Sequence, residues 1–186
     1  MWQSLSARLK LSDFRRKEDG SASLEALIMA PAMFWIFMAM FSFFHTYQEY
    51  SVNQKTAYTL SDMISRETLP LDGLYMDGLQ DMLGYMTHST GDPAIRVTSL
   101  KYNATEKRFY VHWSRVRGSV TPVSDADVAT WTSRVPILAD GEYIVITETF
   151  TKFDPPFKVG LLRQDIDNFV FTRPRYAPRV LYEGSV

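Results

Sequence analysis

The sequence predicts an α+β protein, in which a long N-terminal helix spans a membrane and continues into a small exported domain with an antiparallel sheet packed on the helix. Three observations support this prediction. The 19 residues from Ala26 to Phe44 contain no charged side chain. Basic residues cluster before this run and are absent from the ten residues after it. Several segments beyond residue 93 alternate apolar and polar residues, which is typical of half-buried strands.

The apolar run has the length of a membrane span. At about 1.5 Å per residue it forms a helix of roughly 28 Å, close to the thickness of the hydrocarbon core of a bilayer. A buried helix of a soluble domain usually has a polar stripe, and this run has none. A removable secretory signal has a shorter apolar centre that ends in an A-x-A-like site, whereas Ala30–Pro31–Ala32 lies in the middle of the run. We therefore predict a transmembrane helix within residues 21–45.

The charges on either side of the run predict its orientation. The first basic residue after it is Lys55. Because positively charged flanks stay in the cytoplasm, the N-terminus is expected inside and residues 46–186 outside the cytoplasm. Residues 1–20 are a basic leader whose positive side chains are Arg8, Lys10, Arg15, Arg16 and Lys17.

The helix is expected to continue well beyond the membrane. Neither glycine nor proline occurs between Phe44 and Arg66, and apolar residues recur there at roughly helical spacing. We predict one helix from Ser21 to Arg66, which ends before Pro70. Pro31 lies inside it, where a kink is tolerated in a membrane helix.

The remaining segments predict one α+β domain with a sheet packed on the second half of the long helix. Ser124 is a typical cap for a short helix. The expected elements are a helix at 71–86, strands at 94–102 and 108–116 joined by a hairpin at 103–107, a helix at 124–135, and strands at 142–153 and 167–175.

The composition excludes several classes of function. The chain has 186 residues, of which 46% are hydrophobic and 22% charged, and its net charge is −1. There is no basic field that would indicate nucleic-acid binding. The chain has no cysteine, which excludes disulfides, thiolate metal sites, cysteine nucleophiles and lipid attachment at a cysteine.

The sequence contains no recognisable catalytic or metal-binding motif. His45, His88 and His112 are too far apart to match a known ligand spacing. The glycines are scattered and form no phosphate-binding loop, and no acidic segment has the spacing of a calcium loop. Asn103-Ala-Thr105 matches a glycosylation acceptor, a short pattern that is common by chance. We therefore expect no enzyme activity, metal or cofactor.

The N-terminal segment resembles a known family. The stretch "FRRKEDG" ends at Gly20, Glu25 is the fifth residue after it, and the apolar run starts at Ala26. This pattern resembles the type IV prepilins. The longer stretch "DGSASLEALIMAP", which includes Pro31, is similar to the TadE-like pseudopilins, minor pilin-like proteins of tight-adherence (Flp) pili. The later stretches "ETFTKFDPPF" and "FVFTRPR" are similar to the closing strands of TadE-like proteins.

The resemblance implies a pilin-like fold, a processing step and a set of partners. A prepilin peptidase would cut after Gly20 and expose the α-amine of Ser21, and Glu25 would pair with that amine in a neighbouring subunit. The implied partners are the peptidase, other pilus subunits, the inner-membrane assembly platform and membrane lipid. The implied location is the bacterial inner membrane, with the C-terminal domain in the periplasm. Major pilins usually start with an aromatic or apolar residue, so a start at Ser21 favours a minor component and leaves N-methylation open.

Other interpretations remain open. Glu25 could only favour the N-terminus of the helix, an effect of about 0.3–1 kcal/mol, and Ser21 and Ser23 could be ordinary caps. The chain could be an uncleaved single-span scaffold or partner-binding protein of the TadG type. An envelope enzyme is the third alternative.

Overall fold

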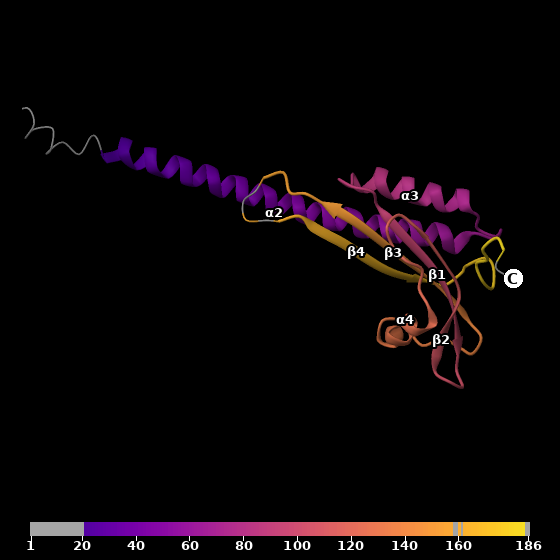
Figure 1. The fold of residues 1–186 in the computed structure, drawn as a ribbon. Helices are drawn as coiled ribbons and strands as arrows, with labels where there is room; N and C mark the ends of the chain where they lie inside the picture. Colours follow the sequence, from indigo (N-terminus) through magenta and orange to yellow (C-terminus); the bar gives the residue numbers. More distant parts are fainter. Residues whose placement is uncertain (1–20, 158–159, 161, 185–186) are drawn as a thin grey trace, which may run out of the picture. The chain divides into compact units, whose positions relative to one another are not determined.

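The computed structural model of the chain describes residues 21–157, 160 and 162–184. The chain divides into two compact units, Met1–Phe44 and His45–Val186, which we describe separately. The helices and strands, shown in Figure 1, are α2 (Ser21–Arg66), α3 (Gly73–Thr87), β1 (Ala94–Asn103), β2 (Arg108–Arg117), α4 (Asp125–Val128), the 3₁₀ helix η2 (Ala129–Ser133), β3 (Tyr143–Phe153) and β4 (Gln164–Thr172).

The long helix has the predicted bounds. α2 has 46 residues and is continuous from Ser21 to Arg66. Pro31 lies inside it, so the carbonyl of Leu27 lacks its usual N–H donor. The helix ends four residues before Pro70, and Arg66 forms an i,i+4 ion pair with Asp62 in its last turn.

The four strands of the second unit form one antiparallel sheet in the order β2-β1-β3-β4. The predicted β1–β2 hairpin is confirmed, with a turn at residues 104–107. The Asn103 Oδ1 atom closes this turn by accepting hydrogen bonds from the backbone N–H groups of Thr105 and Glu106. The register of β1 against β2 shifts between Ser99 and Leu100.

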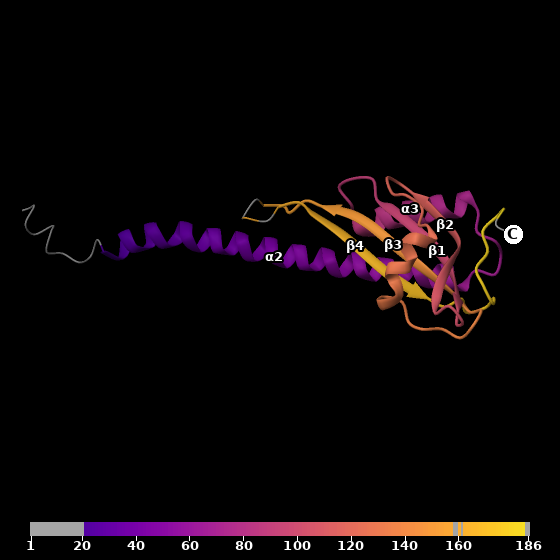
Figure 2. The same ribbon diagram turned by 60° about the horizontal axis from the view of Figure 1, so that its bottom comes forward.

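One face of the sheet packs on helices, as the sequence predicts. The second part of α2 contributes Leu60 and Ile64 to this core, which also includes residues of α3 and of the first three strands. Figures 1 and 2 both show α3 on this side of the sheet and α4 away from it. The buried residues of this core are Leu60, Ile64, Leu71, Met76, Leu79, Leu83, Ile95, Val97, Trp113, Val145 and Val180.

The opposite face of the sheet carries a second core, which the sequence did not predict. Val128 of α4 and Trp131 of η2 pack there against apolar side chains of the strands, and the Trp131 ring meets the Phe169 ring edge-on at 5.2 Å. Its buried residues are Leu100, Tyr102, Phe109, Val123, Val128, Trp131, Val135, Leu138, Ile144 and Ile146. Both faces of β1 and β3 are therefore buried.

The short helix expected within residues 124–135 is confirmed, but it is of mixed type. Only Asp125–Val128 is α-helical, and Ala129–Ser133 is a 3₁₀ helix. The cap at Ser124 is confirmed, because the Asp127 carboxylate accepts hydrogen bonds from the Ser124 N–H at 2.9 Å and from its hydroxyl at 2.7 Å. Pro136 disfavours a helical conformation at the residue before it, which limits the length of this segment.

Two other boundaries differ from the prediction. α3 begins at Gly73 because the Asp72 side chain caps it, accepting the Tyr75 N–H at 2.7 Å, while Leu71 bridges to Tyr182. β4 spans residues 164–172 instead of 167–175 because it pairs with β3 down to Gln164, opposite Phe153.

Candidate functional site

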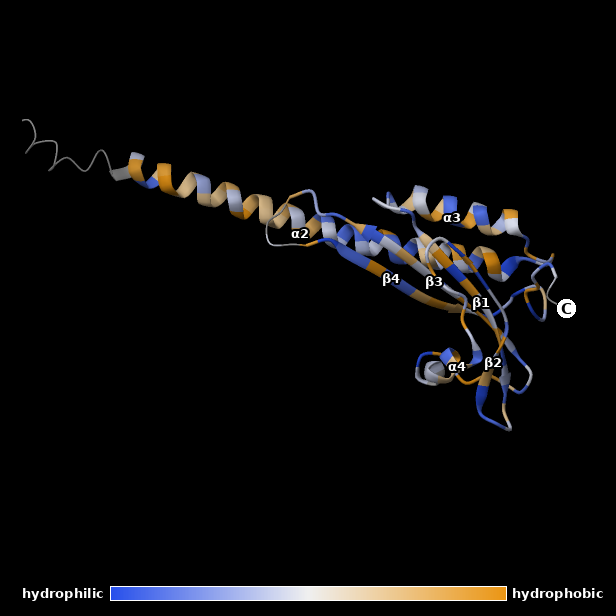
Figure 3. Cartoon of the chain, in the orientation of Figure 1, coloured by the Kyte–Doolittle hydropathy of each residue, from blue (hydrophilic) through white to orange (hydrophobic). Residues whose placement is uncertain are grey.

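The described part of the first unit is a helix that is apolar around its whole circumference. The five consecutive residues Met33–Phe37 are all exposed, and because successive residues are about 100° apart they cover every direction around the axis. Figure 3 shows the corresponding apolar colouring of this part of α2. The large apolar side chains, which are 46–71% exposed, are Leu24, Leu27, Ile28, Met29, Met33, Phe34, Trp35, Ile36, Phe37, Met40, Phe41, Phe43 and Phe44.

A surface of this kind is unfavourable in water. Contiguous exposed apolar area on this scale marks contact with a membrane or with another protein. In the described part of the chain, α2 is the one helix that is long and apolar enough to cross a membrane, a property that a signal sequence near an N-terminus shares. This half of α2 therefore calls for an apolar environment that the chain itself does not supply.

Glu25 is the one charged residue on the described part of this apolar half. Its side chain is exposed, and it has no hydrogen-bond or ion-pair partner among the described residues. It lies beyond the first helical turn, which contains no acidic residue. Because the effect of the helix dipole falls off within the first turn, Glu25, the fifth residue of α2, lies at the edge of its range.

The other residues singled out from the N-terminal pattern are only partly covered by the structure. Gly20 lies outside the described residues. Ser21 is the first residue of α2, four positions before Glu25. Pro31 lies within α2, which is continuous across it.

In the second unit, α2 contacts the sheet through small polar side chains. The Thr151 hydroxyl of β3 donates to Asn53 Oδ1 at 2.5 Å, and the hydroxyls of Ser61 and Thr172 share a hydrogen bond. The Asn53 amide in turn donates to the Glu49 carbonyl at 2.9 Å. Sequence reasoning missed these contacts, although the alternation of threonines in "TETFT" indicates a strand face that carries hydroxyls.

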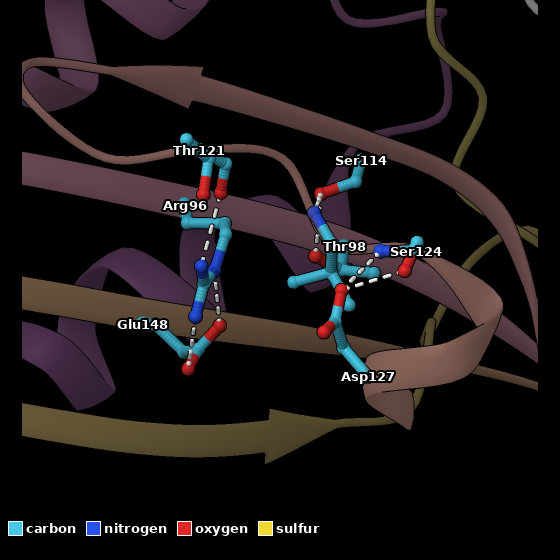
Figure 4. A network of polar contacts seen from close by, with 8 residues as sticks. Arg96, Thr98, Ser114, Thr121, Ser124, Asp127 and Glu148 are labelled. Carbon is cyan, nitrogen blue, oxygen red and sulfur yellow. Dashed lines mark hydrogen bonds and ion pairs between the residues drawn. The ribbon is translucent and has the colours of Figure 1, made fainter. Parts of the chain in front are cut away.

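The opposite face of the sheet holds a buried ion pair, shown in Figure 4. The Arg96 guanidinium donates from Nε and Nη2 to the two carboxylate oxygens of Glu148, at 2.6 and 2.8 Å, and from Nη1 to the Thr121 carbonyl at 3.0 Å. Only 18% of the Arg96 side chain and 8% of the Glu148 side chain are exposed. A bidentate pair of this kind fixes geometry, here by holding the loop before α4 against β1 and β3.

A second set of hydrogen bonds holds the same loop. The hydroxyls of Thr98 and Ser114 share a hydrogen bond of 2.9 Å, and Ser114 Oγ accepts the Val123 N–H at 3.1 Å. Figure 4 shows this set beside the Ser124–Asp127 cap. These polar groups are satisfied within the fold, so their arrangement explains structure and not catalysis.

The three histidines take separate structural positions. His45 stacks on Phe153 with ring centroids 5.5 Å apart, and His88 is the C-cap of α3 with a positive φ of 47°. His112 lies beside Arg179 and Tyr143, and burial, followed by the positive charges of Arg179 and Lys101, lowers its pKa. Within the described residues, no three His, Asp or Glu side chains gather into a group that could hold a metal ion.

A groove of about 470 Å³ lies at the end of the sheet where β3 begins and β4 ends. Glu142 and Arg173, which line it, form an ion pair with both side chains more than 40% exposed. Solvent-exposed ion pairs of this kind contribute little to stability. Comparisons with protein-family models, with curated proteins and with solved structures found no match to this chain. The apolar half of α2 with Glu25 is therefore the feature of this chain that most needs a functional explanation.

Proposed function

We propose that this chain is a TadE-like minor pilin that takes part in assembly of a tight-adherence (Flp) pilus. In this proposal Ala26–Phe44 anchors the chain in the bacterial inner membrane and the second unit is periplasmic. The observation that carries it is Glu25, a carboxylate without a partner among the described residues, in a helix half that is apolar on all sides. The continuity of α2 into a domain with an antiparallel sheet is compatible with a pilin-like fold.

The chemistry gives Glu25 a reason to be present. A carboxylate placed in the apolar part of a bilayer costs on the order of 3 kcal/mol on insertion scales, so it is normally paired or functional. Cleavage after Gly20 would create an α-amine on Ser21, close to the depth of Glu25. Pairing between the Glu25 carboxylate of one subunit and the Ser21 amine of its neighbour would neutralise both charges, so assembly is favoured over isolated subunits.

Processing is tested by the intact mass of the mature protein. In cells with an active prepilin peptidase, we expect the chain to begin at Ser21 and to have lost the mass of residues 1–20. Gly20→Phe should block the cut because a large side chain hinders the approach of the backbone to the peptidase, while Gly20→Ala should retain more cleavage. A wild-type chain that keeps residues 1–20 would contradict the proposal and fit an uncleaved scaffold of the TadG type.

Assembly is tested by co-purification with other pilus components. Glu25→Ala and Glu25→Gln should insert and be cleaved but fail to join the complex, because the partner amine loses its counter-charge. Glu25→Asp keeps the charge and should restore part of the binding, and Ser23→Ala is the matched control two residues away. If Glu25→Ala assembles as well as wild type, Glu25 has only a local effect on the helix.

Orientation is tested with a reporter enzyme that is active only in the periplasm. A fusion after Val186 should be active because the basic leader keeps the N-terminus in the cytoplasm. A well-expressed but inactive fusion would contradict the proposed topology.

A further inference from the structure

Two cationic side chains approach one aromatic ring at the end of the sheet where β3 begins. The Lys101 ammonium of β1 lies 5.9 Å from the centre of the Tyr143 ring, and the Arg179 guanidinium lies 5.7 Å from it. Arg179 also donates from Nη1 to the Tyr143 hydroxyl oxygen at 3.4 Å and lies 3.5 Å from His112 Nε2. We call Lys101, His112, Tyr143 and Arg179 the basic cluster.

A bulge in β2 brings His112 into this cluster. The register of β1 against β2 shifts here, so His112 has no Cα partner on β1. Trp113, directly after it, belongs to the core beneath α2 and α3, whereas Val111, directly before it, packs against the second core on the opposite face. The His112 ring meets the Tyr143 ring edge-on at 5.4 Å. Bulges re-aim side chains in this way and are common beside active sites.

The fold holds the two cations near each other. The Trp113 indole N–H donates to the carbonyl of Val180 at 3.0 Å, and Val180 is buried, so the backbone directly after Arg179 is attached to the sheet. Lys101 lies within the sheet, opposite Tyr143 of β3. Both cationic side chains are exposed, so a group from outside the chain can reach them.

The basic cluster contains no negative charge. Neither Lys101 nor Arg179 forms an ion pair with a carboxylate of the described residues, and the nearby acids Asp140 and Glu142 take part in other contacts. Burial, followed by the positive charges of Arg179 and Lys101, lowers the pKa of His112, so this ring is neutral at neutral pH. Two positive charges without a counter-charge repel each other, and binding of an anion offsets this repulsion.

A groove beside the cluster has room for the chain that carries the anion. It is the groove of about 470 Å³ described above, and Tyr143 belongs both to its lining and to the cluster. Ala177 and Pro178 add apolar surface to it. Because Asp140 and Glu142 also line the groove, an anion with one negative charge is favoured over an anion with two. A carboxylate has one negative charge, and its two oxygens match the paired donors of a guanidinium.

We propose that the basic cluster binds the carboxylate of an acidic side chain of a partner polypeptide, whose neighbouring residues lie in the groove along Tyr143. The Arg179 guanidinium donates to the carboxylate oxygens, and Lys101 supplies the second positive charge. Such a contact selects an acidic partner and speeds its encounter more than it adds affinity. The second unit alone carries this inference, which therefore rests neither on membrane anchoring nor on pilus assembly.

The histidines allow a direct test by nuclear magnetic resonance. The full chain, which has three histidines, is labelled with ¹³C-histidine and studied in a non-ionic detergent without phosphate. The probe is a five-residue peptide of glycines with one central glutamate, capped at both ends and added at millimolar concentrations. The same peptide with glutamine in place of glutamate is the control. His112→Gln assigns the signal, whose pKa is then measured with and without peptide.

The proposal expects the glutamate peptide to shift the His112 signal until it saturates and to raise the His112 pKa, because a bound carboxylate offsets the positive charges beside the ring. The glutamine peptide should have no effect. Arg179→Gln should by itself raise the His112 pKa and weaken peptide binding several-fold. Arg108→Gln is the matched control and should leave binding unchanged, since Arg108 also lies over a tyrosine ring, at 4.4 Å, but has Glu106 as its counter-charge.

Three results would overturn the proposal. The first is the lack of a saturable shift with the glutamate peptide in a chain whose near-UV circular dichroism shows a folded second unit. The second is an equal response to the glutamine peptide, or tighter binding of inorganic phosphate, which would indicate a phosphate site. The third is peptide binding that persists in both Arg179→Gln and Lys101→Gln, which would place the carboxylate elsewhere on the chain.

Discussion

The two halves of α2 belong to one helix but have opposite surfaces. In the described part of the first unit, exposed apolar side chains point in every direction around the helix. In the second unit, a single stripe is buried, and it mixes small polar residues with apolar ones: Asn53, Thr56, Ala57, Leu60, Ser61, Ile64 and Ser65. A uniform apolar surface suits a solvent such as lipid, which has no preferred direction, whereas a mixed stripe recognises one particular protein surface.

The carboxylates of the two units show the same contrast. Glu148 is buried in the sheet and has its own counter-charge in Arg96. Glu25 has no such partner among the described residues. Burial of a charge is tolerated when a counter-charge lies beside it, as at Glu148, and the proposed function supplies such a counter-charge to Glu25 from a neighbouring subunit.

The largest expected effect on stability comes from comparing a buried residue of α2 in the second unit with an exposed residue of α2 in the first unit. Leu60→Ala should lower the free energy of unfolding of the second unit by about 3–5 kcal/mol, because it leaves a cavity in a fully buried core. Ile36→Ala, in the first unit, should leave that free energy unchanged. Urea unfolding of the full chain in detergent, followed by near-UV circular dichroism, measures both. Equal losses in the two variants would remove the distinction between the halves.

A smaller effect is expected at the buried ion pair. Glu148→Gln should destabilise the second unit by about 2–3 kcal/mol, less than for a fully buried pair, because Arg96 loses its charged partner but keeps some contact with solvent. Adding Arg96→Met should recover part of this loss. Asp62→Asn, which affects exposed pairs with Arg66 and Arg175, should cost less than about 1 kcal/mol. Similar losses for Glu148→Gln and Asp62→Asn would show that burial of the pair is unimportant.

The polar residues of the buried α2 stripe should contribute less to stability than the buried ion pair does. Asn53→Ala removes the acceptor of the Thr151 hydroxyl and should cost about 1 kcal/mol, since Thr151 can still donate to the Ile166 carbonyl at 3.2 Å. Gln54→Ala, at the exposed neighbouring position, is the matched control and should have no measurable effect. Chemical denaturation measures the free energy of unfolding of both variants. If Asn53→Ala is as stable as wild type, only the apolar residues of the stripe contribute to its packing on the sheet.

The smallest effect concerns Asp167, a carboxylate of the folded unit without a counter-charge among the described residues. Partial desolvation of the Asp167 side chain, and then the negative charges of Asp165 and Glu148, raise its pKa above its ordinary value of 3.8. Because the folded state binds the proton more tightly, stability should fall as pH rises from about 3.8 through the raised pKa. Asp167→Asn should remove this dependence and stabilise the domain near neutral pH by well under about 1 kcal/mol, since the side chain is exposed. Thermal unfolding measured from acidic to neutral pH checks the sign, and a steeper slope in the variant would contradict it.

Features that depend on local pattern could be predicted from the amino-acid sequence alone. The uncharged run, the absence of helix breakers up to Arg66 and the alternation in β1, β2 and β3 predicted the long helix and most of the sheet. The sequence also determined that the carboxylate of Glu25 lies next to an apolar segment. These features depend on residues close together in the chain, whose spacing directly reflects the periods of helices and strands.

The contacts between residues far apart in the chain became known from the folded structure. The second core on the far face of the sheet, the pair between Arg96 and Glu148, and the extension of β4 to Gln164 all join residues far apart in the chain. A strand buried on both faces is usually a continuous apolar run, but β1 and β3 include buried polar residues such as Thr98, Thr147 and Glu148, so their sequences still alternate. A charged residue, in turn, does not reveal its partner. The second core and the pair between Arg96 and Glu148 form where α4, η2 and the loop before them pack on the far face of the sheet, and the extension of β4 follows from its pairing with β3.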